Sequence, residues 1–150
     1  MVNPALEAVL AGSDEDTHLW NLYLSTTGPT NEAQHAFHYA MEAMILIGSD
    51  GFEKLFEQDP SMEEYSEALV EVGIPQVKPI FDRVLALIPD ELRKPENDKA
   101  LYSHLRSLFE ELRLLASEFN DATADGGWAA ARYVRLHRDQ FVELGHNPIN

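Results

Sequence analysis

Residues 97–119 read NDKALYSHLRSLFEELRLLASEF and carry the strongest structural pattern of the chain. Apolar side chains recur in this stretch at alternating spacings of four and three residues, as they do on one face of an α-helix. The pattern predicts a single helix from Asn97 to about Phe119. Because the stripe is shorter than about three heptads, we expect it to pack into a globular core and not into a coiled coil. The residues of the stripe are Leu101, Leu105, Leu108, Leu112, Leu115 and Phe119.

Helical periodicity also dominates the rest of the chain, and no run of alternating apolar and polar residues predicts a strand. Gly and Pro residues separate the periodic segments, and Ser61 with Glu64 is typical of a capping box at a helix start. The last helix is expected to open at Gly127 and to reach Leu144, with a frayed tail from Gly145 to Asn150. We therefore predict an all-α protein that folds as one compact domain of seven or eight helices over residues 1–150.

The composition is that of a globular protein, with 45% apolar and 25% charged residues. Cysteine is absent, which excludes disulfides, thiolate metal sites and cysteine nucleophiles. The first twelve residues carry Glu7 and no basic residue, so no secretory signal is expected. The longest apolar run, Ala43 to Ile47, is far shorter than the roughly 20 residues that span a bilayer. These features predict a cytoplasmic protein.

Acidic residues are concentrated in one part of the sequence. The formal net charge is −15, and residues 50–71 hold eight acids against one base, Lys54. Glu63, Glu67 and Glu71 follow at i, i+4 and i+8, about 6 Å apart along a helix, which is comparable to the spacing of phosphates on a nucleic-acid strand. A stretch this acidic repels nucleic acid and attracts basic proteins. Spacing alone leaves open whether it forms a plain solvated face or an anion-mimicking one. The predicted partner-binding residues are Asp50, Glu53, Glu57, Asp59, Glu63, Glu64, Glu67 and Glu71.

No catalytic signature accompanies this charge. No serine lies in a Gly-x-Ser-x-Gly elbow, and no Gly-rich phosphate loop precedes a lysine. We therefore predict a protein without enzymatic activity, cofactor or bound metal. One alternative is a metal site or minor enzymatic activity on a single helix face, because four potential ligands stand three or four residues apart. These four residues are Glu32, His35, His38 and Glu42.

Arg132, Arg135 and Arg138 form a small basic cluster near the C-terminal end. Three arginines in a chain of this net charge do not make a nucleic-acid site. We expect them to pair with acids of this chain or of a second copy.

Three short blocks resemble a known bacterial family. Residues 48–56, GSDGFEKLF, resemble the signature of the DNA mimic protein nineteen-like domains, and residues 68–74, ALVEVGI, are similar to the next block of that family. Residues 133–141, YVRLHRDQF, resemble its closing helix, so the family-like core covers about residues 30–144. The resemblance implies an all-α fold and an acidic, dimeric surface. It also implies that such a surface can imitate DNA and occupy the DNA-binding face of a transcription factor.

The leading hypothesis is therefore a non-catalytic, acidic interaction domain that binds a basic protein such as a transcription factor, by imitating DNA. An immunity-type protein that neutralises a basic toxin or nuclease would use the same electrostatics and stays open as a second hypothesis. Neither hypothesis involves direct nucleic-acid or membrane binding, and either permits a homodimer.

Overall fold

The computed structural model describes the backbone of residues 3–146 and the side chains of residues 3–144. This part of the chain contains nine α-helices and five short 3-10 helices, without a strand, so the predicted all-α class is confirmed. Of the predicted tail, Gly145 and His146 belong to a 3-10 helix, and residues 147–150 lie outside the described residues. The α-helices are α1 (Pro4–Leu10), α2 (Asp16–Ser25), α3 (Glu32–Asp50), α4 (Met62–Glu71), α5 (Lys78–Ala86), α6 (Asp98–Ser107), α7 (Phe109–Ala122), α8 (Gly126–Leu136) and α9 (Arg138–Phe141). The 3-10 helices are η1 (Phe52–Glu57), η2 (Pro75–Val77), η3 (Asp90–Arg93), η4 (Pro95–Asn97) and η5 (Val142–His146).

Side-chain caps fix the starts of the helices that carry the candidate site. Asn31 accepts a hydrogen bond from the backbone N–H of Gln34 at 2.9 Å, which begins α3. Ser61 accepts one from the N–H of Glu64 at 3.2 Å, which begins α4 as its sequence predicts. Each cap satisfies an N–H group that the helix itself leaves without a partner.

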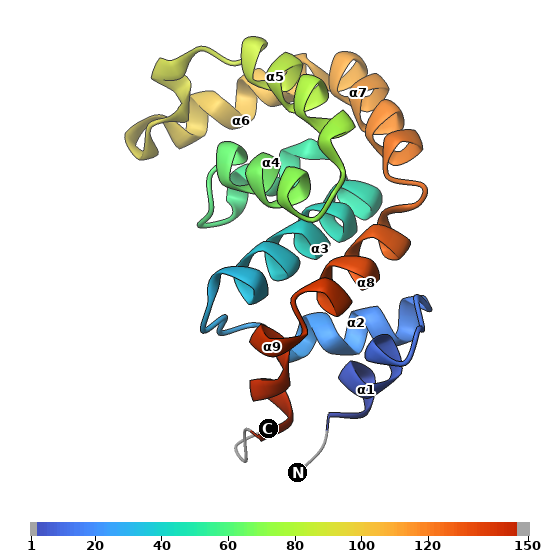
Figure 1. Ribbon diagram of the computed structural model, residues 1–150. Helices are drawn as coiled ribbons and strands as arrows, with labels where there is room; N and C mark the ends of the chain where they lie inside the picture. Colours follow the sequence, from blue (N-terminus) through green and yellow to red (C-terminus); the bar gives the residue numbers. More distant parts are fainter. Residues whose placement is uncertain (1–2, 147–150) are drawn as a thin grey trace.

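Helix α3 is the centre of the packing and contacts α4, η1, α7 and α8 (Figure 1). Helices α5, α6 and α7 lie at one end of α3, and α1, α2 and α9 lie at the other. Phe52, Phe81 and Phe119 meet edge to face with ring centroids 5.4 to 6.0 Å apart, a geometry that aromatic pairs prefer. They bring η1, α5 and α7 together in one continuous core.

The predicted helix over residues 97–119 is interrupted at Leu108. Leu108 leaves the helical region with φ −101° and ψ 15°, so that α6 and α7 are separate helices. The Ser107 hydroxyl donates to the carbonyl of His104 at 2.6 Å, a bond that competes with the helical hydrogen-bond ladder and bends helices. Leu105 and Leu112 remain buried on either side of the bend, so the leucine spacing was compatible with both a straight and a broken helix.

Three further boundaries differ from those that the sequence predicts, which are a helix end at Gly48, a loop from Asp121 to Gly127 and an unbroken last helix to Leu144. Helix α3 continues past Gly48 to Asp50 and is ended by Gly51, whose φ of 82° suits glycine. The predicted loop from Asp121 is shorter because α7 extends to Ala122. The predicted last helix is broken at His137, where φ is −115° and ψ is 32°, and the chain then forms α9 and η5.

Over residues 3–146, no helix combines the length and the apolar character that crossing a membrane requires.

Candidate protein-interaction surface

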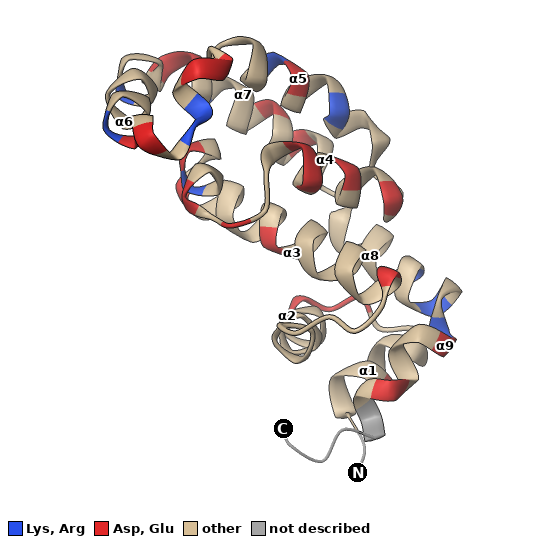
Figure 2. Ribbon diagram, turned by 90° about the vertical axis from the view of Figure 1, so that its left-hand side faces the viewer, with Lys and Arg blue, Asp and Glu red and all other residues tan. Residues whose placement is uncertain are grey.

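Helix α4 divides its residues cleanly between core and solvent. Met62, Tyr65, Ala68 and Leu69 are buried, and Glu63, Glu64, Glu67 and Glu71 are exposed. In Figure 2 the acidic residues of α4 form successive bands along its outward side. The periodicity of an amphipathic helix therefore places the glutamates of this segment in solvent.

A partly buried hydrogen bond fixes α4 on α3. The Tyr65 hydroxyl donates to Glu42 Oε2 of α3 at 2.7 Å, and the Tyr23 hydroxyl reaches Glu42 Oε1 at 3.5 Å. Burial raises the pKa of Tyr65 and the hydrogen bond to the Glu42 carboxylate raises it further. Burial and the same carboxylate raise the pKa of Tyr23 to about 12. Both phenols therefore stay protonated donors at neutral pH.

Two of the eight predicted acids are paired within the molecule. Glu63 accepts a hydrogen bond from Arg93 at 3.0 Å, and Arg93 also contacts Asp90. Glu57 lies 3.4 Å from Lys54. Within residues 3–144 no basic side chain comes within 4.0 Å of the remaining six predicted acids. These six are Asp50, Glu53, Asp59, Glu64, Glu67 and Glu71.

The predicted acids do not all border the same hollow. Asp59 and Glu63 line a groove of about 470 Å³ where the loop before α4 meets Arg93. Asp50 and Glu53 border a different groove, between the end of α3 and α7, beside Phe109 and Arg113. The acids of α4 and Asp59 thus form one group, which we call the α4 acidic surface (Asp59, Glu63, Glu64, Glu67 and Glu71). Asp50 and Glu53 form a second group, and Glu57 stands paired on η1.

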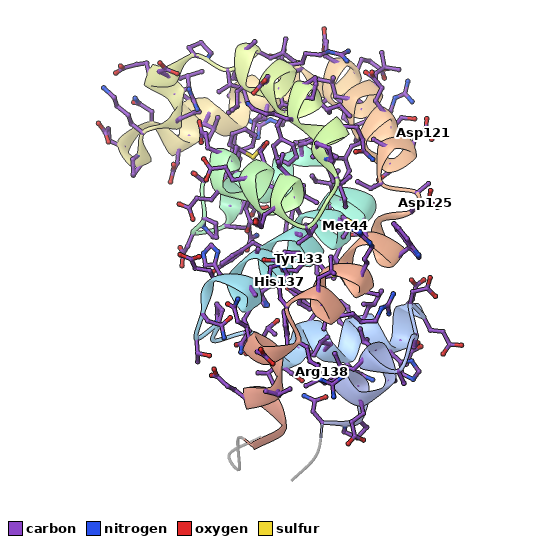
Figure 3. The ribbon with its side chains drawn as sticks, in the orientation of Figure 1. Met44, Asp121, Asp125, Tyr133, His137 and Arg138 are labelled. Carbon is purple, nitrogen blue, oxygen red and sulfur yellow. The ribbon has the colours of Figure 1, made fainter. Side chains whose placement is uncertain are left out.

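One acid of the α4 acidic surface acts on a tyrosine of α8. Burial raises the pKa of Tyr133 to about 12, and the charges of Glu71 and Glu32 contribute. Figure 3 labels Tyr133 on α8 and His137 directly after it, and their ring centroids lie 4.1 Å apart. Glu71 of α4 and Glu32 at the start of α3 therefore both contribute to the raised pKa of Tyr133 on α8.

A third groove lies between α4 and α5 and was not anticipated from the sequence. It has a volume of about 330 Å³ and combines acidic with apolar residues. Val70 is the one signal that the sequence offered, because it is an apolar residue at an exposed position between acids. The lining residues are Glu63, Ser66, Glu67, Val70, Glu71, Lys78, Phe81, Asp82 and Leu85.

The four potential metal ligands of α3 have other partners or lie apart. His38 is buried, bonds to the Thr26 hydroxyl at 2.9 Å and stacks on Tyr23 at 4.5 Å between ring centroids. Burial lowers the pKa of His38. Glu42 is held by the two tyrosines, whereas Glu32 and His35 are exposed. In the described part of the chain, no group of three or more His, Asp and Glu side chains could hold a metal ion.

Within residues 3–144 the arginines near the C-terminal end do not pair with acids of this chain, and pairing with acids of a second copy stays a prediction. Arg135 donates to the carbonyls of Val9 at 2.9 Å and Ser13 at 3.4 Å, at the C-terminal end of α1 and in the turn that follows it. Arg132 lies 5.9 Å from the ring centre of Trp128, and Arg138 is exposed at the start of α9 (Figure 3). None of these three arginines forms an ion pair within residues 3–144.

Comparison with known proteins identifies the family. No curated protein and no solved structure matches the chain. The family model described as DMP19-like protein matches residues 29–137, which is well over half of the chain. The match begins just before α3 and ends with α8, so it includes the signature at residues 48–56, α4 and both grooves beside α4. The resemblance noted in the sequence is therefore confirmed, and the chain belongs to the DMP19-like protein family.

Proposed function

We propose that this protein is a non-catalytic interaction domain that binds a basic protein through the α4 acidic surface. The observation that carries the proposal is the state of Glu64, Glu67 and Glu71. All three are exposed and lack a basic partner within residues 3–144, on a helix that the Tyr65–Glu42 bond holds in place. Carboxylates held in this way are acceptors for charge-assisted hydrogen bonds from Lys and Arg.

The arrangement also supports imitation of a nucleic-acid backbone. Glu67 and Glu71 are one helical step of four residues apart, about 6 Å along the axis, so they present negative charge at roughly the interval of phosphates. A basic DNA-binding face is built to meet such an array. Membership of the DMP19-like family supports this form of the proposal, in which the partner is a DNA-binding protein.

The test is charge reversal with a charge-matched control. A variant with Glu64, Glu67 and Glu71 changed to Lys should lose capture of a basic partner from the native host extract. A control with Glu96, Glu111 and Asp121 changed to Lys has the same net charge, because it also replaces three acids with three lysines. These three acids are exposed and lie outside the α4 acidic surface. The control should keep capture, and captured partner should dissociate as salt shortens the Debye length from about 10 Å at 0.1 M.

Two results would reject the proposal. Retained capture by the α4 variant would show that this surface is not used. Equal loss in both variants would show that net charge, and not the α4 acidic surface, governs binding. Circular dichroism of both variants verifies that the helices remain folded.

A further inference from the structure

We propose that the groove between α4 and α5 binds one face of an amphipathic basic helix of the protein partner. In this arrangement an apolar side chain of the partner lies on the groove floor, and arginine or lysine side chains meet the acidic rim. The inference rests on the proposed function, because Glu67 and Glu71 belong both to the α4 acidic surface and to the groove.

The floor of the groove suits an apolar side chain. Val70 is 37% exposed within it, although it is an aliphatic residue, and Leu85 lies half-buried on the α5 side above the fully buried Phe81. Imitation of phosphates does not require an apolar floor, because a nucleic-acid backbone presents charged and polar groups to its protein partner. The floor instead favours a ligand that removes Val70 and Leu85 from water.

The charges of the rim determine what lies beside the apolar side chain. Lys78 and Asp82 of α5 pair at 3.4 Å, and Arg93 already occupies Glu63. Among residues 3–144, no basic side chain pairs with Glu67 or Glu71, which lie four residues apart on the α4 rim. A partner helix with two basic residues four apart presents cations at the same interval as these two carboxylates.

The size of the groove indicates how much of the partner enters. A volume of about 330 Å³ is at the lower end of the range of ligand pockets, roughly 300–1,000 Å³. It accommodates one or two side chains and not a whole helix, so the partner helix lies across the groove and inserts its apolar residue. This mode is a variant of helix-in-groove recognition with an acidic border.

Two synthetic peptides of equal charge test the proposal. Both are helical and carry arginines four residues apart, and the first has a leucine between them on the same face where the second has serine. Binding to the full chain is measured by fluorescence anisotropy at fixed salt. We expect the leucine peptide to bind about tenfold more tightly, because burial of a leucine side chain supplies at least that factor.

Variants of the protein assign the preference to the groove. Val70→Ser should weaken the leucine peptide about threefold and leave the serine peptide unchanged, because Val70 buries only its exposed third on binding. Val70→Thr keeps the β-branched shape and should show an intermediate effect, which guards against a folding defect in the serine variant. Leu114→Ser is the matched control, because Leu114 is an exposed apolar residue on α7 and should affect neither peptide.

The outcomes separate this inference from the proposed function. Equal binding of both peptides, insensitive to Val70→Ser, would overturn the groove while charge-driven binding stands. Failure of both peptides to bind would also overturn the groove proposal. The proposed function would then still be decided by whether charge reversal of Glu64, Glu67 and Glu71 abolishes capture of the native partner. If the charge-reversed variant still captured the native partner, the proposed function itself would be rejected.

Discussion

Removing the Tyr65 hydroxyl tests whether α4 is fixed by a hydrogen bond to a carboxylate. In Tyr65→Phe, Glu42 loses the donor at 2.7 Å and keeps only the Tyr23 hydroxyl at 3.5 Å. A hydrogen bond to a charged group contributes about 1.5–3 kcal/mol, so we expect the free energy of unfolding to fall by about 2 kcal/mol. For a chain of this length that corresponds to a decrease in Tm of roughly 4–8 °C.

The pH dependence of the same variant gives an independent check. The pKa of Tyr65 is raised in the folded protein, chiefly by burial, above its ordinary value of 10.0. Stability from this group is therefore complete below pH 10 and is lost as pH rises above 10, because only the unfolded chain then releases the proton. The wild type should lose up to about 1.4 kcal/mol per pH unit more than Tyr65→Phe in this range.

Urea denaturation followed by circular dichroism measures both effects, with Tyr23→Phe as the matched control. The longer Tyr23 bond should contribute less, so the control should lose under about 1 kcal/mol at neutral pH. Equal losses in the two variants, or a difference between wild type and Tyr65→Phe that stays constant above pH 10, would refute the role assigned to the Tyr65–Glu42 bond.

Three other changes have expected outcomes. Because burial lowers the pKa of His38 below 6.5, protonation favours the unfolded chain, and stability in urea should decline as pH falls below 6.5; a His38→Gln variant that declines equally would contradict this. Gly51→Ala should destabilise the protein by about 1 kcal/mol or more, because the φ of Gly51 is 82°. Gly48→Ala in the exposed part of α3 should instead stabilise it by about 0.5–1 kcal/mol. Thermal melts in which both variants shift Tm in the same direction would refute this pair of expectations. Arg93→Gln removes the ion-pair partner of Glu63 and should raise the affinity of the leucine peptide about twofold, an increment typical of an exposed ion pair. The anisotropy assay measures this affinity. A reduced affinity would exclude Glu63 from the rim.

Local signals in the sequence predicted the helices well where one side chain decides the boundary. Ser61 caps α4 as expected, and the alternation of acids with Met62 and Leu69 correctly separated the solvent side from the core side. The break at Leu108 was not predictable from the leucine spacing, because a kink between two buried leucines preserves the pattern of four and three. It depends on a hydroxyl-to-carbonyl bond at Ser107 and on the packing of α6 and α7 against different neighbours.

The candidate site was predictable as a set of residues but only partly as a surface. Residue spacing placed Glu67 and Glu71 together, because both belong to one helix. It could not show that Asp50 and Glu53 border another groove, or that Arg93 reaches Glu63 from thirty residues away. Those facts depend on how α4, α5 and the segment after α5 pack, which is tertiary information.

Long-range attraction and short-range fit make different demands on the same helix. Screened charges steer a basic partner over about 10 Å but fix its orientation weakly, because a carboxylate attracts any nearby cation with similar energy. Orientation requires contacts that vanish when the partner slides by one residue, and an apolar side chain on a shaped floor is such a contact. Glu64 faces solvent outside the groove, whereas Glu67 and Glu71 border its floor beside Val70. In the proposed binding mode, the acids of α4 attract the partner, and the two that adjoin Val70 position it. Added salt should therefore act mainly on the association rate, and loss of Val70 mainly on the dissociation rate.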